Sequence, residues 1–264
     1  MAENNIAQRI GRNLGAYYGE GIDIVSCLNE ARDTALAHGW TVEKFPATDG
    51  PELFAFKRLV PQPTKRIYIS TGIHGDEPAG PLAACELLRR NEWPACTDLW
   101  FVPCLNPTGF PLNTRESANG VDLNRDYRHL LTAEVRAHVA WLEQQPKFDL
   151  SLCLHEDWEA HGFYVYELNP DHQPSLAVPM VAAVREVCPI DHSTLIDGRD
   201  ARDGIIRPDI DPASRPQWAE AFYLITHKTR LSYTLEAPSD FPLNLRVAAL
   251  VTAVQATVNL ACAA

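Results

Sequence analysis

One histidine and one glutamate in the first third of the chain have the side chains and the spacing needed to hold a catalytic metal ion. His74 and Glu77 lie in the segment Thr71-Gly-Ile-His-Gly-Asp-Glu-Pro78, directly after an apolar run. A catalytic zinc ion takes nitrogen and carboxylate ligands from three side chains and keeps a fourth position open for water. Taken alone, His-x-x-Glu is a weak signal in a chain with nine histidines. Its place between a predicted strand and a predicted helix favours a ligand pair over a surface turn with a capping glutamate.

A second histidine, His155, ends the apolar segment Leu150-Ser-Leu-Cys-Leu154. Considered alone, a histidine in that position is more often a core residue than a ligand. Together with His74 and Glu77 it completes the ligand set of the His2Glu catalytic zinc sites. We therefore predict one Zn2+ ion bound by these three residues, with zinc inferred from the ligand types. The helical HExxH pattern is absent, and His161, six positions further on, is a weaker alternative ligand.

A carboxylate suited to act as a base ends another apolar segment. Glu236 lies in Ser232-Tyr-Thr-Leu-Glu-Ala-Pro238. There it is either a solvated strand end or a base directed into a cleft. Zinc lowers the pKa of bound water to about 7, and a nearby glutamate can take the proton and deliver it to a leaving amine. Glu236 is therefore the candidate general base.

A polar loop supplies candidates for substrate binding. Residues 106–131 have few helix or strand signals, and a connection of that length is often functional. The loop contains Arg115, Asn124 and Arg125. Loop arginines are usually solvated, but a guanidinium group matches a carboxylate in shape and charge, and an adjacent Asn adds a donor. In an acidic chain these residues indicate an anionic substrate group, and an arginine can also stabilise the oxyanion of a tetrahedral intermediate.

The spacing of apolar residues predicts the strands and helices that must position these side chains. The predicted strands are Trp40–Phe45, Leu53–Leu59, Arg66–Ser70, Leu99–Leu105, Asp149–Leu154, Phe163–Leu168 and Leu231–Leu235. The predicted helices are residues 22–38, Pro78–Arg90, Ala133–Glu143, Ala177–Val187, Trp218–Thr226 and Asn244–Leu260. Residues 189–216 are irregular and charged, as in a lid or rim. This alternation is typical of an α/β fold, whose sheet binds ligands beyond the carboxyl ends of its strands.

Length and composition limit the class of protein. A chain of 264 residues can bury a sizeable core, and with no linker, low-complexity tract or repeat we expect a single domain over residues 1–264. The formal net charge of -11 disfavours nucleic acid and anionic membranes as partners. We find no secretion signal at the N-terminus and judge no stretch long and apolar enough to span a bilayer. Seven cysteines without a CxxC pair fit free thiols in a reducing compartment, so a cytoplasmic location is expected.

Several motifs in a fixed order carry a family resemblance. They are Gly72-Ile-His-Gly-Asp-Glu77, Asn106-Pro-Thr-Gly109, Gly120-Val-Asp-Leu-Asn-Arg125, the strand-terminal His155 and Thr234-Leu-Glu236. Together they resemble the zinc carboxypeptidases of the carboxypeptidase A type (family M14), especially its short bacterial branch. That branch includes murein peptide amidases and grades into succinylglutamate desuccinylase and aspartoacylase. The resemblance covers roughly residues 66–240.

The resemblance implies a fold, an activity and a role for each matching residue. The zinc ligands that it implies are His74, Glu77 and His155. Glu236 would be the general base and acid, and Arg115 would polarise the scissile carbonyl. Asn124 and Arg125 would hold the terminal carboxylate of the substrate. The implied fold is a single-domain α/β sandwich with a mixed, mainly parallel eight-stranded sheet covered by helices on both faces.

Two features depart from the family pattern. The residue after the second zinc histidine is usually small, whereas here Glu156 and Asp157 follow. This carboxylate pair either lies beside the metal, where it would alter the charge preference for substrate or favour a second metal, or points to solvent. The family's carboxypeptidases also place a tyrosine over the substrate some twenty residues before the base. Tyr223, thirteen residues before it, is nearer, so a capping tyrosine is unassigned. Asp76 either hydrogen-bonds a ligand histidine or caps the following helix.

Three functions compete at the level of sequence. The leading one is a zinc hydrolase of the metallocarboxypeptidase type, which cleaves an amide or peptide bond adjacent to a free carboxylate. The second is an N-acyl amino acid amidohydrolase of the desuccinylase or aspartoacylase kind, with nearly the same site. The third is a non-catalytic zinc-binding protein on the same scaffold, which the presence of every ligand and the base disfavours. The expected partner is a small peptide or N-acyl amino acid with a free carboxylate. The sequence does not indicate the oligomeric state.

Overall fold

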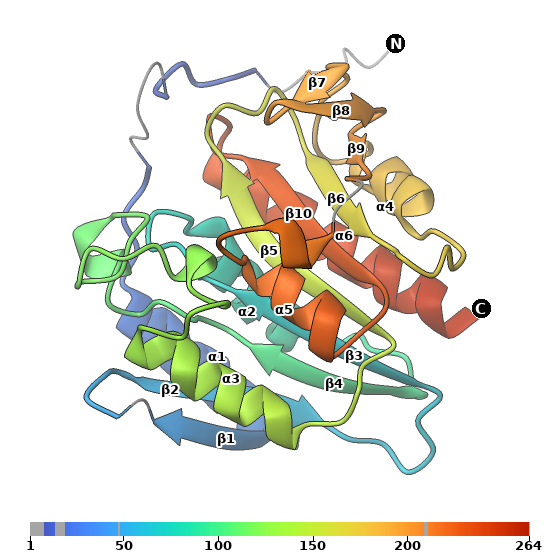
Figure 1. Cartoon of the computed structure of the whole chain (residues 1–264). Coiled ribbons are helices and arrows are strands. Elements are labelled where there is room, and N and C mark those ends of the chain that lie inside the picture. Colours follow the sequence, from blue (N-terminus) through green and yellow to red (C-terminus); the bar gives the residue numbers. More distant parts are fainter. Residues whose placement is uncertain (1–7, 14–18, 47, 209–210, 264) are drawn as a thin grey trace.

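A single mixed sheet runs through the molecule. The structure, a computed structural model, describes residues 8–13, 19–46, 48–208 and 211–263. Within these residues ten strands form a sheet in the order β1-β2-β4-β3-β5-β10-β6-β9-β8-β7 (Figure 1). The strands are β1 (Thr41–Pro46), β2 (Glu52–Arg58), β3 (Lys65–Thr71), β4 (Thr97–Val102), β5 (Leu150–Asp157), β6 (Tyr164–Leu168), β7 (Leu195–Ile196), β8 (Arg199–Arg202), β9 (Ile205–Ile206) and β10 (Ser232–Pro238).

The centre of the sheet is parallel. Strands β4, β3, β5 and β10 pair in parallel, whereas β1 with β2, β2 with β4, and β6 with β10 pair in antiparallel fashion. On its other side β6 pairs in parallel with β9. Every residue of β4 is buried, as are the first seven of the eight residues of β5. Such continuous apolar runs are typical of parallel strands with both faces covered. The four central strands therefore end at one common edge, where the site lies.

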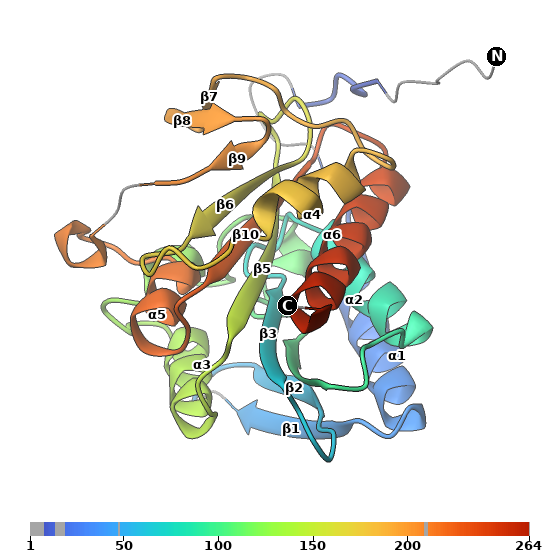
Figure 2. The same cartoon turned by 90° about the vertical axis from the view of Figure 1, so that its right-hand side faces the viewer.

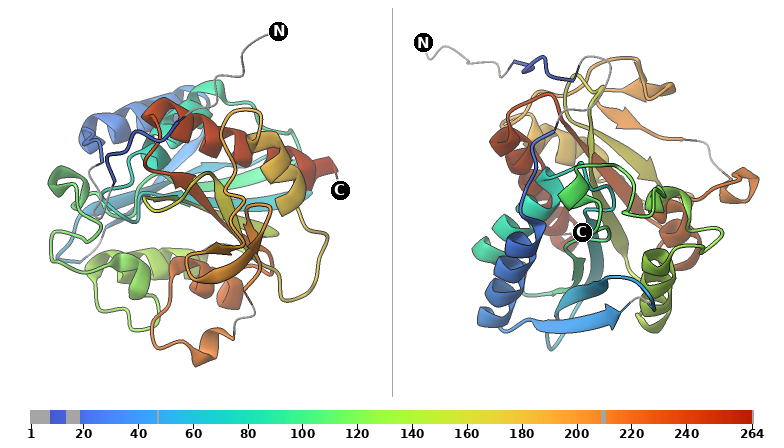
Figure 3. Two further views of the ribbon diagram at one scale, coloured as in Figure 1. Left: turned by 90° about the horizontal axis from the view of Figure 1, so that it is seen from above. Right: turned by 90° about the vertical axis from the view of Figure 1, so that its left-hand side faces the viewer.

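Helices cover both faces of the sheet. On one face lie α1 (Ile24–Ala37), α2 (Ala79–Arg90), α4 (Ala177–Val184) and α6 (Leu243–Ala263), and on the other lie α3 (Ala133–Gln144) and α5 (Glu220–His227) (Figures 2 and 3). Alternate residues of β3 divide between two apolar clusters. Ile67 and Ile69 pack under α2 with the first cluster, and Tyr68 packs with α3 and α5 in the second. This two-residue period fixes which side chains face each layer.

The predicted α/β fold class is confirmed, and the predicted strand number is wrong. The seven strands predicted from the apolar pattern correspond to β1 to β6 and β10, but the sheet has ten strands instead of eight. Residues 189–216, predicted as irregular, contain β7, β8 and β9. Strands of two to four residues show too few positions for a two-residue period to be recognised. Parallel pairing prevails in the centre, and antiparallel pairing at the sides.

The C-terminal helix corrects the prediction that no segment is long and apolar enough to cross a bilayer. Helix α6 has 21 residues and a mean hydropathy of 1.5 over its most apolar window, which satisfies both criteria. Half of that window is buried, because α6 packs on α2, α4 and β10. A helix buried in a core meets the same criteria as a membrane span, since both surroundings select apolar residues. The predicted lack of a secretion signal concerns residues 1–7, which lie outside the described residues.

Candidate metal centre and substrate cleft

The ends of β3 and β5 bring the three predicted metal ligands together. After β3 the chain turns at Gly72, whose φ of +63° favours glycine, and the turn carries His74 and Glu77 before α2 begins. A second glycine in this turn, Gly75, lies so close to the following polar loop that an added Cβ would be 2.2 Å from the carbonyl carbon of Gly109. The glycines of the two sequence motifs are therefore required for the close approach of these loops.

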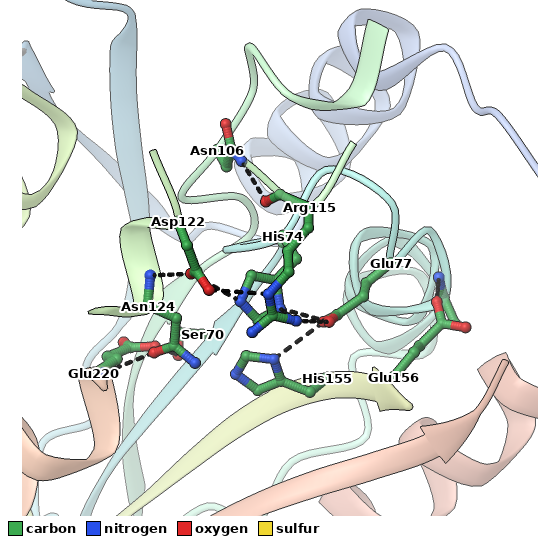
Figure 4. A network of polar contacts seen from close by, with 12 residues as sticks. Ser70, His74, Glu77, Asn106, Arg115, Asp122, Asn124, His155, Glu156 and Glu220 are labelled. Carbon is green, nitrogen blue, oxygen red and sulfur yellow. Dashed lines mark hydrogen bonds and ion pairs between the residues drawn. The ribbon is translucent and has the colours of Figure 1, made fainter. Parts of the chain in front are cut away.

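The ligand atoms converge on one point (Figure 4). Nδ1 of His74 lies 2.5 Å from Oε1 of Glu77, and Nδ1 of His155 lies 3.0 Å from Oε2 of the same carboxylate. One ligand atom from each residue lies within 4.8 Å of the other two, and all three side chains are buried. The structure thus brings together all three residues predicted as ligands.

The chemistry of this donor set fits a divalent metal ion. Burial raises the pKa of Glu77, but the charges of His74 and His155 and their hydrogen bonds outweigh burial, so that the pKa lies well below its usual range. An ionised carboxylate and two imidazole nitrogens in a buried site are the donors that zinc prefers. Nε2 of His74 is also buried and makes no hydrogen bond within the described residues. The residues present therefore suit a zinc-type ion.

Asp122 is a site residue that the sequence analysis did not single out, although it lies in the Gly-Val-Asp-Leu-Asn-Arg motif. Its Oδ2 accepts a hydrogen bond from Nε of Arg115 at 2.9 Å, and its Oδ1 lies 3.3 Å from Nε2 of His74. Oδ1 also accepts the backbone N–H of Asn124 at 2.9 Å. Burial raises the pKa of Asp122, but the contacts with His74 and Arg115 outweigh it and hold the pKa well below its usual range. Asp122 is thus the carboxylate beside the ligand histidine, a position considered for Asp76.

The three predicted substrate-binding residues line the cleft next to the ligands. Nη1 of Arg115 lies 3.8 Å from Oε1 of Glu77, and Asp122 fixes the orientation of the guanidinium group. Oδ1 of Asn124 accepts the backbone N–H of Glu220 at 2.8 Å, which leaves the amide nitrogen available to the cleft. Arg125 is exposed at the rim, and its Nη1 donates to the backbone oxygen of Asn124. The structure therefore brings together the predicted Asn-Arg pair and Arg115.

Glu236 lies directly beside the ligands on the neighbouring strand. The parallel register of β10 and β5 pairs Glu236 with His155, and the antiparallel register with β6 places Tyr164 on its other side. The side chain is half-buried, and none of the described residues hydrogen-bonds to its carboxylate. Burial raises the pKa of Glu236 well above its usual range, although the charge of His155 acts in the opposite direction. A carboxylate with a raised pKa and no partner is suited to exchange protons.

The open side of the site is a cleft of about 460 Å³ that contains all seven predicted site residues. Tyr164, Tyr166 and Phe222 line its opposite wall. Tyr223 of α5 does not line this cleft, because it is buried against Tyr127 and His227. The substrate-capping tyrosine therefore stays unassigned.

The two carboxylates after His155 have different surroundings. The prediction that both lie beside the metal and the alternative that both point to solvent are therefore wrong. The carboxylate of Glu156 is buried in the core, where it accepts the first N–H of α2, from Ala79, at 2.5 Å, and pairs with Nη1 of Arg246 at 2.5 Å. Burial raises the pKa of Glu156 to about 7, against the effect of Arg246. Asp157 does line the cleft, but its carboxylate accepts a hydrogen bond from the Tyr164 hydroxyl at 3.0 Å. Glu156 also takes the helix-capping position considered for Asp76.

Sequence comparisons match parts of the chain to one family model and to a plant carboxypeptidase. Residues 63–192 match the family model of the succinylglutamate desuccinylase/aspartoacylase catalytic domain. A segment of 108 residues is 33% identical to carboxypeptidase SOL1 of Arabidopsis thaliana. That segment covers 31% of this chain and only 21% of the plant protein.

Solved structures share the fold over most of the chain. A Shewanella amazonensis protein, provisionally assigned as a metallopeptidase, has a TM-score of 0.77 and 23% identity, with 90% of this chain and 93% of that chain covered. A Pseudomonas aeruginosa metallo-carboxypeptidase, solved with (2-guanidinoethylmercapto)succinic acid, has a TM-score of 0.64 and 17% identity, with 89% and 68% covered. Carboxypeptidase A of Helicoverpa armigera has a TM-score of 0.62 and 14% identity, with 89% and 72% covered.

The class defined by fold and site is a protein with the fold of the metallo-carboxypeptidases and a buried His-Glu-His cluster able to hold a metal. The comparisons confirm the resemblance predicted from the motifs. Residues 63–192 are similar to the succinylglutamate desuccinylase/aspartoacylase catalytic domain, and the fold is shared with metallo-carboxypeptidases. The matched segment includes His74, Glu77 and His155, whereas Glu236 lies beyond it.

Proposed function

We propose that this protein is a zinc-dependent hydrolase that cleaves an amide or peptide bond adjacent to a free carboxylate. One observation carries the proposal. A single cleft holds a buried His2Glu donor set, an Asn-Arg pair, and beside the donor set a carboxylate that has no hydrogen-bond partner among the described residues. Each part meets one requirement of the reaction. The donor set would hold the metal that activates water, the carboxylate transfers protons, and the Asn-Arg pair binds the carboxylate of the substrate.

The residues of the cleft divide the chemistry between them. A zinc ion held by His74, Glu77 and His155 would supply a bound water of lowered pKa. Glu236 accepts a proton from the attacking water and passes it to the leaving amine, and the pKa raised by burial makes it a stronger base than an exposed carboxylate. Arg115, held by Asp122, lies where its guanidinium group can stabilise the negative charge that develops on the carbonyl oxygen.

The substrate is a small molecule with a carboxylate next to the scissile bond. Asn124 offers an amide nitrogen and Arg125 a guanidinium group, which together bind a carboxylate through charge-assisted hydrogen bonds. Support comes from the Pseudomonas aeruginosa metallo-carboxypeptidase of the same fold, whose ligand is a substituted succinic acid. Peptides with a free C-terminus satisfy this requirement.

An N-acyl amino acid is the second candidate substrate. The specific observation in its favour is the match of residues 63–192 to the desuccinylase and aspartoacylase catalytic domain, since those names denote acyl-group removal. The same catalytic residues would serve, and the Asn-Arg pair would bind the carboxylate of the amino acid. A non-catalytic zinc-binding role is the third candidate and requires only the ligands.

Substitution of Glu236 tests the proposal directly. Glu236→Gln keeps the size of the side chain but removes proton transfer, so kcat should fall by roughly 100-fold or more on the best substrate. The metal content should stay equal to that of the wild type, because Glu236 is not a ligand. Glu143→Gln, an exposed position on α3, is the matched control and should keep full activity. Full activity in Glu236→Gln would refute the assignment of the base.

A substrate panel separates the three candidates. It contains peptides with free and with amidated C-termini, a murein tripeptide and N-acyl amino acids, all tested with zinc-loaded protein. Cleavage that needs the free C-terminus supports the metallocarboxypeptidase type, and cleavage restricted to N-acyl amino acids supports the acylase. Stoichiometric zinc without turnover of any member supports the non-catalytic role.

A further inference from the structure

Two cysteines from neighbouring helices meet on the face of the sheet opposite the cleft wall formed by α5. Helices α1 and α2 lie side by side there (Figure 2). Cys27 of α1 and Cys85 of α2 face each other, and their Sγ atoms are 3.1 Å apart. This distance is shorter than van der Waals contact between two sulfur atoms and only about 1 Å longer than a disulfide bond of about 2.05 Å.

Each thiol also reaches into the other helix. Sγ of Cys27 lies 3.5 Å from the carbonyl oxygen of Pro81, and Sγ of Cys85 lies 3.3 Å from the carbonyl oxygen of Cys27. These contacts hold both side chains in the space between the helices instead of in separate pockets. The pair is therefore positioned by the packing of α1 on α2.

The pair is accessible to a small oxidant. Cys27 is 7% exposed and Cys85 is 5% exposed, and both line an open groove of about 700 Å³ between α1, α2 and the start of α6. Cys104 and Cys188 are buried and line neither this groove nor the catalytic cleft, and Cys153, which lines the cleft, makes no contact with a second cysteine among the described residues. Accessibility and a nearby second thiol together distinguish the pair from a structural buried cysteine.

We propose that Cys27 and Cys85 form a reversible disulfide that ties α1 to α2 when the protein meets a hydroperoxide. The thiolate of Cys85 attacks the peroxide, so that an S–O bond forms, the O–O bond breaks and hydroxide or alkoxide leaves. The thiol of Cys27 then attacks the sulfenic sulfur, the S–S bond forms and the oxygen leaves as water. The two sulfur atoms lose two electrons in total, and the peroxide gains both.

The local hydrogen bonding agrees with this order of attack. The hydrogen bond with Cys27 lowers the pKa of the Cys85 thiol, against the effect of burial. The same hydrogen bond, together with burial, raises the pKa of Cys27. Cys85 is thus the thiolate that reacts first, and Cys27 is the resolving thiol. The disulfide does not depend on the proposed hydrolase activity, because neither cysteine lines the catalytic cleft.

The test is mass mapping of the wild-type protein after mild oxidation. The reduced, folded full-length chain is treated with hydrogen peroxide, free thiols are alkylated, and the protein is digested without reduction. We expect a cross-linked peptide that contains Cys27 and Cys85 and has lost two hydrogen atoms, and we expect dithiothreitol to restore both thiols. Because the wild type is mapped, the result does not depend on whether a variant folds.

A second measurement tests the link between the helices. The crosslink closes a loop of 58 positions and restricts the unfolded chain, so the oxidised protein should unfold at a higher temperature than the reduced protein. Cys85→Ser should abolish that difference, whereas Cys96→Ser, which removes the cysteine next to Cys262, should retain it. Two alkylated thiols at positions 27 and 85 after peroxide treatment would overturn the proposal. A disulfide found only between Cys96 and Cys262 would overturn it equally.

Discussion

The two glutamates of the site have opposite electrostatic surroundings. Glu77 faces two histidine Nδ1 atoms, which keep its pKa low, whereas Glu236 lacks a hydrogen-bond partner among the described residues and has a raised pKa through burial. Two carboxylates with pKa values driven apart are typical of a site that divides ligand and acid-base roles between them. The difference arises from position, because Glu77 lies between the histidines and Glu236 lies beside them on β10.

A third titratable residue, His138, is buried away from the cleft. Its Nε2 lies 2.8 Å from the hydroxyl of Tyr68, and its Nδ1 lies 2.7 Å from the hydroxyl of Tyr127. Burial lowers the pKa of His138 to about 3. In the unfolded chain the imidazole begins to bind a proton near pH 6.5, and at that pH the buried imidazole of the folded protein is still neutral.

The acid stability of the protein should depend on His138. Because the folded pKa is lowered, the stabilisation is complete above about pH 6.5 and is lost as the pH falls toward about 3. Between pH 7.5 and pH 5 the unfolded chain gains a proton that the folded chain does not, which costs about 2 kcal/mol. Urea unfolding at both pH values should show that the loss is smaller by about this amount in His138→Gln. An equal loss in both proteins would contradict the prediction.

The convergence of the three candidate ligands was predictable from sequence because each lies at or after the end of a strongly apolar strand. His74, Glu77 and His155 lie at the ends of β3 and β5, and parallel strands end at one edge. The surroundings of Glu156 were not predictable, because its partner Arg246 lies 90 positions away in a helix that reads as apolar. Asp122 was missed for a related reason, since a loop has no period that tells which way a side chain points.

At the scale of elements, strand β5 places functional or structural side chains on both faces of the sheet. Successive side chains of a strand point to opposite faces, so His155 points into the cleft and Glu156 points toward α2 and α6. Glu156 joins the start of α2, which follows Glu77, to Arg246 of α6. Strand β5, which carries the candidate ligand His155, therefore also fixes the position of α2, the helix that follows the candidate ligand Glu77.

Breaking this buried ion pair should destabilise the fold strongly. The side chain of Arg246 is fully buried, and it also pairs with Glu20. Arg246→Met leaves the Glu156 carboxylate buried without a counter-charge, which should cost about 3–5 kcal/mol of the free energy of unfolding. Arg246→Met with Glu156→Gln should recover part of that loss. Denaturant unfolding of the two single variants and the double variant measures the coupling.

An exposed ion pair provides the control for this prediction. Arg230 pairs with Asp171, and both side chains are about half exposed. Arg230→Met should therefore cost no more than about 1 kcal/mol. Equal losses in Arg246→Met and Arg230→Met would show that the buried pair has no special weight in the fold.

The long elements were predictable, and the short ones were not. Each of the six helices predicted from apolar spacing corresponds to one of α1 to α6, with ends shifted by a few residues. Strands β7 to β9 lie in a charged segment where too few residues alternate. They form the sheet edge at the rim of the cleft, which is the region predicted as a lid or rim.

At the scale of the whole molecule, the site joins parts of the chain that are far apart in sequence. The candidate ligands come from β5 and from the turn between β3 and α2, and the proposed base comes from β10, so the candidate metal site depends on the central parallel sheet. The single-domain organisation and the cytoplasmic location stay predictions. Because the ligands form one site only in the folded chain, metal binding should be linked to global stability.

Zinc should raise the temperature of unfolding of the protein. A ligand that binds only the folded state stabilises it by about 2.7 kcal/mol at 100 times its dissociation constant. For a chain of this size that corresponds to a rise of roughly 5–10 °C in the midpoint. Calorimetry of chelator-treated protein with and without zinc measures the shift. His155→Ala should abolish the shift because it removes a ligand, whereas His161→Ala should keep it because that exposed side chain lies outside the ligand cluster. A full shift in His155→Ala, or its loss in His161→Ala, would move the metal site away from the end of β5.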